Sequence, residues 1–177
     1  MARAMDRGKQ RPGWRIQTAP VKLPNANDQV SDAHASGAWS GAHVIQKSSN
    51  VGAAKIALGL QREDMWDMFK RVGFGTLPAL GFPGEAHGKV RDWKTWRPIE
   101  QATMSYGHGI SVSLIQLARA YSIFARDGEL MPLTPVKADM PVAGKRVISA
   151  EPARAVREML EMAVQPRGPA PRARVMG

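Results

Sequence analysis

The sequence contains no cysteine, few aromatic residues and no long apolar run. Without cysteine it can form neither disulfide bonds nor zinc sites with thiolate ligands, although this absence does not fix a cellular compartment. Aromatic residues make up 6% and hydrophobic residues 44% of the 177 positions, which favours helices packed through aliphatic and methionine side chains. The longest uncharged run, residues 102–118, is too polar for a membrane span. No signal peptide is visible at the N-terminus.

The net charge of +10 is concentrated at the two ends of the chain. Residues 1–15 carry +4 and residues 165–177 carry +3 of this charge. We expect both ends to be poorly structured, and no stripe of basic residues with interleaved aromatic residues lies between them. Nucleic acid is therefore not an expected partner, and a basic protein that binds nucleic acid through its ends is a less favoured alternative.

The composition divides the chain into three parts. Residues 1–40 are rich in Pro, Gly, Asn, Asp and Ser, which predicts a loop-rich N-terminal part with a short strand around residues 14–17. Residues 41–164 show helical periodicity and form the predicted helical portion. Residues 165–177 form a basic, proline-rich tail.

Apolar residues recur with helical spacing in four segments, at 53–60, 65–72, 114–124 and 156–163. We expect Ser111 or Ser113 to cap the third of these helices and Ser149 the fourth. Residues 73–98 predict a long loop in which Trp93 and Trp96 act as packing anchors. Short strands are predicted at residues 130–137 and 145–148.

The tripeptide Ser48-Ser49-Asn50 lies between two predicted helical segments. Ser-x-Asn is one of three short motifs in the active sites of penicilloyl-serine enzymes. On its own the motif is weak, because Ser and Asn at a helix start also cap the free N–H groups of the first turn. Its flanking sequence makes the catalytic interpretation the stronger one.

The Ser-x-Asn segment at 44–57 resembles class B penicillin-binding proteins, most closely the septal peptidoglycan D,D-transpeptidase of cell division. The resemblance continues, in the family's order, over residues 30–34, over Gly-Phe-Pro-Gly at 81–84, and over 97–109, 111–130 and 156–174. It implies an α+β domain, mainly helical in this chain, that is part of the penicillin-binding transpeptidase or serine β-lactamase-like fold. In that fold a helical subdomain packs against a five-stranded antiparallel sheet.

By this resemblance, Ser48 is the hydroxyl that relays a proton during acyl transfer, and Asn50 holds an amide carbonyl of the substrate. Ser49 is the variable middle position. The residue types suit these roles, because a hydroxyl both donates and accepts a hydrogen bond, while a side-chain amide orients a peptide amide without titrating.

The nucleophilic serine of Ser-x-x-Lys and the Lys-Thr-Gly motif are both absent from the chain. We expect Met1 to fall just beyond the nucleophile and Gly177 to stop shortly before Lys-Thr-Gly. The chain is thus interpreted as part of a transpeptidase domain, inactive in isolation. A catalytically dead module that binds other division proteins is the alternative.

For the longer parent protein, the resemblance implies D-Ala-D-Ala stem peptides as substrates, β-lactams as inhibitors and division-complex membrane proteins as partners. It places that parent at the periplasmic face of the cytoplasmic membrane. No cofactor and no metal are implied. The histidines at positions 34, 43, 87 and 108 lack the spacing of metal ligands and are expected on the surface or in loops.

Overall fold

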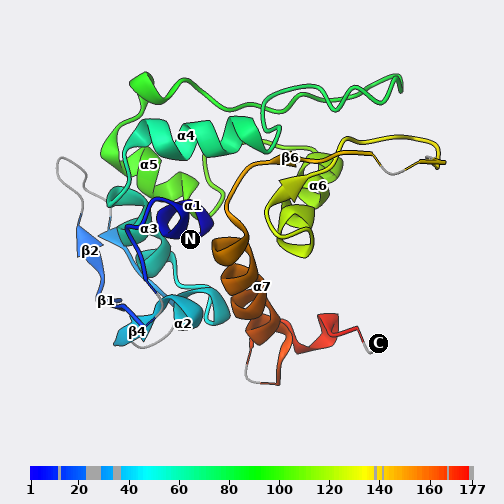
Figure 1. The fold of residues 1–177 in the computed structure, drawn as a ribbon. Helices are drawn as coiled ribbons and strands as arrows, with labels where there is room; N and C mark the ends of the chain where they lie inside the picture. The colour runs from blue at the N-terminus through cyan, green and yellow to red at the C-terminus, as the bar shows by residue number, and fades with distance from the viewer. Residues whose placement is uncertain are drawn as a thin grey trace.

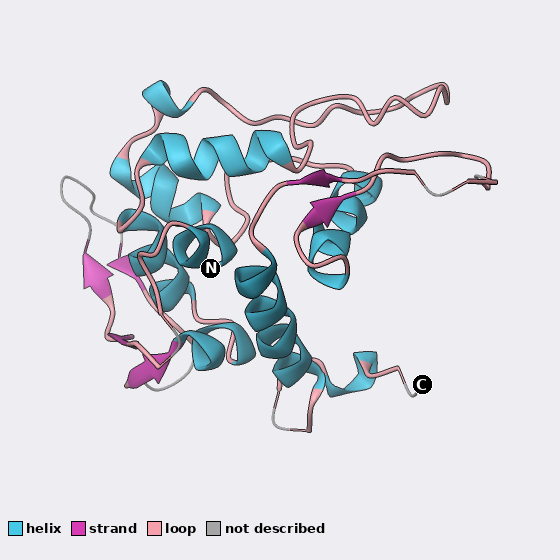
Figure 2. Cartoon of the chain, in the orientation of Figure 1, coloured by secondary structure: helices cyan, strands magenta, loops and turns pink. Residues whose placement is uncertain are grey.

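The computed structural model describes residues 1–11, 13–22, 29–33, 37–137, 139–140, 142–166 and 168–175. Helices dominate this part of the chain and three small sheets accompany them (Figures 1 and 2). The helices are α1 (Ala2–Asp6), α2 (Gly41–Gln46), α3 (Asn50–Leu58), α4 (Arg62–Arg71), α5 (Pro98–Met104), α6 (Leu114–Ala125) and α7 (Ala150–Val164), with 3-10 turns η1 (Trp93–Thr95) and η2 (Pro171–Ala173).

Each of the described sheets is a single antiparallel pair of short strands. The pairs are β1 (Arg15–Gln17) with β4 (Ala38–Ser40), β2 (Val21–Lys22) with β3 (Gln29–Val30), and β5 (Glu129–Leu130) with β6 (Lys145–Arg146). The predicted strand around residues 14–17 is confirmed as β1. Pro132 and Pro135 have no N–H to donate to a ladder, which explains why the strand expected over 130–137 stops at Leu130.

The helix ends follow the predicted signals. Ser113, not Ser111, caps α6: its hydroxyl accepts from the Gln116 N–H at 3.3 Å, and the Gln116 side chain accepts from the Ser113 N–H at 2.8 Å. After α6 the backbone turns through Asp127 (φ 49°) and Gly128 (φ 95°). A Cβ at Gly128 would lie 2.2 Å from the carbonyl oxygen of Ile148, so only glycine fits there.

The largest core cluster joins α1, the end of α4, α6, β5 and α7. Its most buried members are Val147, Ile148, Ile123 and Ala153. Trp96 is 1% exposed and packs with Met65 in a second cluster, which confirms the predicted anchor in the long loop. No helix in the described part of the chain is both long and apolar enough to cross a bilayer.

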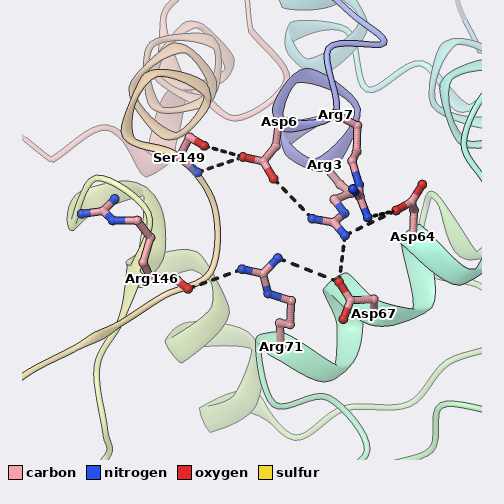
Figure 3. A network of polar contacts seen from close by, with 8 residues as sticks. All are labelled: Arg3, Asp6, Arg7, Asp64, Asp67, Arg71, Arg146 and Ser149. Atoms are coloured by element: carbon pink, nitrogen blue, oxygen red, sulfur yellow. Dashed lines mark hydrogen bonds and ion pairs between the residues drawn. The ribbon is translucent and has the colours of Figure 1, made fainter.

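The expectation of a poorly structured N-terminus is wrong for α1, which lies in the middle of the molecule (Figure 1). Arg3 is 8% exposed and donates to Asp6 at 3.3 Å, to Asp64 at 3.4 Å and to Asp67 at 2.8 Å (Figure 3). Its charge is therefore matched by carboxylates of α4, far away in sequence, and is not part of a surplus of positive charge.

Asp6 links α1 to the start of α7. Its carboxylate accepts from both the N–H and the hydroxyl of Ser149, at 2.9 and 2.8 Å. Ser149 is the N-cap residue of α7 as predicted, but its side chain bonds Asp6 in place of the helix amides. One turn of α1 thus ties α4 and α7 together.

Replacing Arg3 with Gln should destabilise the fold by roughly 2–4 kcal/mol, because the change leaves three carboxylates without their shared cation in a largely buried site. The melting midpoint by circular dichroism measures this loss. The matched control is Arg7→Gln: Arg7 contacts Asp64 from a half-exposed position, so its loss should cost less than about 1 kcal/mol. Equal losses for the two variants would contradict the network.

Candidate functional site

The Ser48-Ser49-Asn50 tripeptide forms the turn between α2 and α3. Ser48 has a left-handed backbone (φ 52°), which redirects the chain between the two helices. The Ser48 N–H donates to the Ile45 carbonyl at 3.1 Å, and the Ser49 N–H donates to Val44 at 2.9 Å. As a result Ser48 is exposed, Ser49 is buried and Asn50 is half-buried.

Ser49, the middle residue, caps α3. Its hydroxyl accepts from the Gly52 N–H at 2.9 Å and donates to the Asp32 carboxylate at 2.5 Å. The other Asp32 oxygen accepts from the Val51 N–H at 3.0 Å. Two N–H groups of the first turn are therefore satisfied by Ser49 and Asp32 together. The helix-cap interpretation of the tripeptide is correct for Ser49.

Ser48 and Asn50 take no part in this capping. The Ser48 hydroxyl and the Asn50 carboxamide have no hydrogen-bond partner within the described residues. A hydroxyl and an amide that are held by a rigid turn, yet not used by it, are available to a ligand. The predicted site residues thus lie on either side of a structural serine.

Gly52 allows α2 and α3 to approach closely beside this turn. A Cβ at Gly52 would lie 2.6 Å from a methyl carbon of Val44 and 3.0 Å from the Ser49 hydroxyl oxygen. A side chain here would therefore push against both the helix contact and the cap. The glycine is part of what fixes the position of Ser48.

The other end of α3 is held by α5. Gln101 of α5 is 4% exposed, and its amide donates to the carbonyl of Ala57 at 2.7 Å and of Leu60 at 3.0 Å. Ala57 lies in the last turn of α3 and Leu60 lies two residues beyond its end, and the Ala57 carbonyl also accepts from the Leu60 N–H at 3.0 Å. Ala102, the next residue of α5, packs with Val51 in a small buried cluster. The helix that begins with Asn50 is consequently fixed at both ends.

A cavity of about 340 Å³ lies beside α5. Its walls come from β3, α5 and the loop after α5, and consist of Gln29, Val30, Arg91, Arg97, Ile99, Glu100, Thr103, Met104, Tyr106, His108 and Gly109. Val30 lines the cavity, and Asp32, two residues further along the chain, holds Ser49. The cavity and the Ser-x-Asn turn therefore share one supporting segment.

Glu100 is the charged centre of the cavity wall. The backbone N–H of Arg97 donates to it at 2.7 Å and the Arg91 guanidinium donates at 2.6 Å. These two contacts lower the pKa of Glu100 from its ordinary value of 4.5 to about 2. The carboxylate is therefore charged at neutral pH.

The model of the penicillin-binding protein transpeptidase domain matches residues 1–177. The chain belongs to this transpeptidase family.

Curated members of the transpeptidase family are substantially longer than this chain. The chain is 40% identical over 168 residues to "Probable peptidoglycan D,D-transpeptidase PenA" of Neisseria gonorrhoeae, and covers 29% of it. It is 34% identical over 174 residues to peptidoglycan D,D-transpeptidase FtsI of Escherichia coli K12, again covering 29% of that protein. These matches take in 95% and 98% of the present chain.

Solved structures of family members superimpose closely. The apo transpeptidase domain of penicillin-binding protein 3 from Burkholderia pseudomallei has a TM-score of 0.94 at 48% identity, over 98% of this chain and 53% of that one. A peptidoglycan glycosyltransferase from Burkholderia ambifaria has a TM-score of 0.93 at 46% identity, over 98% and 56% of the two chains. The predicted family and the α+β transpeptidase fold are confirmed.

Asp32 and Gln101, two residues that hold α3, are not indicated by any motif of the sequence. Asp32 lies in the short segment 30–34 that resembles the family, but nothing in the sequence pairs it with Ser49. Gln101 lies in segment 97–109, which also resembles the family, but nothing in the sequence pairs it with α3. Both act on backbone groups of α3, and such contacts leave no residue pattern in a single sequence.

Three of the four histidines lie in the described part of the chain, and these three are not gathered with other potential metal ligands. His43 contacts the Ser40 hydroxyl at 2.8 Å, His87 contacts the Gly88 carbonyl, and His108 lines the cavity. His34 lies outside the described residues. No group of three or more potential ligands gathers in the described part.

Replacing Asp32 with Asn should loosen the start of α3, since the amide cannot match the charged acceptor of two hydrogen bonds. We expect hydrogen exchange at the Val51 and Gly52 amides to accelerate about tenfold, which corresponds to a loss of about 1.4 kcal/mol. The control is Asp139→Asn, which removes a charge from an exposed loop position. Unchanged exchange in the Asp32 variant would disprove the cap.

The lowered pKa of Glu100 predicts that the folded chain loses stability as the solution becomes acidic. A carboxyl group with a folded-state pKa of about 2 and an ordinary value of 4.5 stabilises the folded chain above pH 4.5, and this contribution is lost as the pH falls toward 2. Melting midpoints measured from pH 6 to pH 2.5 should fall less steeply for Glu100→Gln than for the unmodified chain. Glu158→Gln, at an exposed position on α7, should keep the original slope.

Proposed function

We propose that this chain supplies the Ser-x-Asn wall of a peptidoglycan D,D-transpeptidase active site. The observation that carries the proposal is the division of the tripeptide: Ser49 is buried and caps α3, whereas the polar groups of Ser48 and Asn50 are unused by the fold. The names of the curated relatives, PenA and FtsI peptidoglycan D,D-transpeptidases, agree with this proposal.

In the proposed reaction a serine outside this chain attacks the carbonyl of a D-Ala-D-Ala stem peptide. The serine oxygen forms an ester to the penultimate D-Ala carbonyl, and the terminal D-Ala leaves as its free amine. Ser48 donates a proton toward that leaving nitrogen and recovers it through the lysine of Ser-x-x-Lys. A second peptide amine then attacks the ester, which completes the cross-link and frees the serine.

Asn50 orients the acyl donor in this scheme. Its amide N–H donates to a carbonyl oxygen of the peptide, or to the side-chain amide of a β-lactam that mimics the peptide. Because Asn50 begins α3, its backbone is fixed by the same cap that holds Ser49. We propose a membrane-anchored parent that works on the periplasmic side with the proteins of cell division.

The 177-residue chain alone should form no covalent adduct with a fluorescent penicillin in mass spectrometry, because it has no Ser-x-x-Lys serine. In a complete transpeptidase domain that contains this chain, Ser48→Ala should slow acylation at least roughly 100-fold through loss of proton transfer. Asn50→Ala should mainly weaken binding of the penicillin before acylation.

The control for these variants is Ser122→Ala on α6, whose hydroxyl donates only to the carbonyl of Arg119. It should acylate at the rate of the unmodified domain. A stoichiometric adduct on the isolated chain, or normal acylation of the Ser48 variant, would refute the proposed role.

A further inference from the structure

The cavity beside α5 has no role in the proposed acyl transfer. Its wall includes Glu100, whereas the next residue of α5, Gln101, bonds α3, so two neighbouring residues of this helix serve different sites. The rigid contact of α5 with α3 means that the cavity has a fixed place relative to the Ser-x-Asn turn.

The cavity wall carries hydrogen-bond donors that nothing in the described structure uses. The Tyr106 hydroxyl has no partner there, and burial raises the pKa of Tyr106, so the group stays protonated as a donor. Arg97 is 76% exposed and engages Glu100 through its Nε alone, which leaves its two terminal NH₂ groups free. His108 adds a ring nitrogen from the adjoining loop.

The strongest acceptors of the wall are already occupied. One oxygen of Glu100 accepts from Arg91 at 2.6 Å, and the other accepts from the Arg97 N–H at 2.7 Å. Two guanidinium groups thus face one carboxylate, and the cavity retains a net positive charge. A ligand that offers donors would find few acceptors, whereas an anionic acceptor finds several free donors.

The remaining wall is apolar. Ile99 and Met104 of α5, with Val30 of β3, provide a surface on which a short alkyl chain can pack. A volume of about 340 Å³ lies at the small end of ligand sites and suits one amino-acid residue more than a long chain. The guanidinium of Arg97 matches the planar, two-oxygen shape of a carboxylate better than a point charge would.

We infer that this cavity binds the carboxylate of an acidic residue in a peptide, with Arg97 and Tyr106 as the donors that recognise it. The identification of that peptide as the stem peptide of peptidoglycan rests on the proposed function. The preference for a carboxylate rests only on the donors and the charge of the cavity.

The probes are acetyl-glutamate, its neutral diamide and inorganic phosphate, each titrated into the 177-residue chain and followed through the ring signals of Tyr106 and His108 in NMR spectra. Acetyl-glutamate should shift both signals in a saturable way, and the diamide should bind at least about tenfold more weakly because it lacks the charge. Arg97→Gln should weaken acetyl-glutamate binding about tenfold. Tyr106→Phe should weaken it severalfold and removes only a hydroxyl, so its fold is preserved.

The matched control is Arg126→Gln, which removes an exposed charge at the end of α6 and should leave acetyl-glutamate affinity unchanged. Equal binding of the diamide, equal weakening by Arg97→Gln and Arg126→Gln, or phosphate binding as tight as acetyl-glutamate would each overturn the inference. Binding of the probe requires no acyl transfer. A failure to bind acetyl-glutamate would therefore overturn the carboxylate site alone, and a failure of the Ser48→Ala acylation test would overturn the proposed function alone.

Discussion

The capping of α3 is the constraint on which the site depends. A helix leaves N–H groups unpaired at its start and carbonyls unpaired at its end, and burial makes each of these expensive to leave unsatisfied. Here Ser49 and Asp32 serve the first turn, and Gln101 serves the last. Because Asp32 and Gln101 reach α3 from other segments of the chain, they tie both of its ends to the rest of the molecule. The Ser48-Ser49-Asn50 turn, which leads into α3, is therefore held in place as well.

This arrangement accounts for the contrast within the tripeptide. Ser49 is buried where its hydroxyl meets the first turn of α3, and Ser48, with a left-handed backbone, is exposed beside it. Asn50, as the first residue of the helix, projects beside the cap and is not needed by it. The roles of the three residues thus follow from one local geometry, in which a structural hydroxyl separates two available polar groups.

The parts of the fold that the sequence predicted are those that local periodicity and end signals determine. The helix α6 carries its own apolar spacing, its cap at Ser113 and its stop at Gly128 within a few residues. By contrast, α1 has only five residues, too few to be stable alone, and it depends on contacts between Arg3 and the carboxylates of α4. Those partners lie more than sixty residues away in the sequence. Composition therefore counted Arg3 as part of a basic, poorly structured end, although its charge is paired in the fold.

The same distinction applies to the site. A motif and its flanking sequence predict Ser48 and Asn50 as site residues. The residues that hold this turn and α3 instead act on backbone atoms 19 and more than 40 positions away, which no motif indicates. The contacts that hold α3 all come from residues between Asp32 and Gln101: the cap by Ser49 and Asp32, the close approach at Gly52, and the hydrogen bonds of the Gln101 side chain. The nucleophilic serine takes part in none of them. The described contacts that hold the Ser-x-Asn turn and α3 are therefore made within this segment of the chain. In the proposed acyl transfer, the serine and its lysine meet a turn that these contacts already hold in place, which keeps the reorganisation during the reaction small.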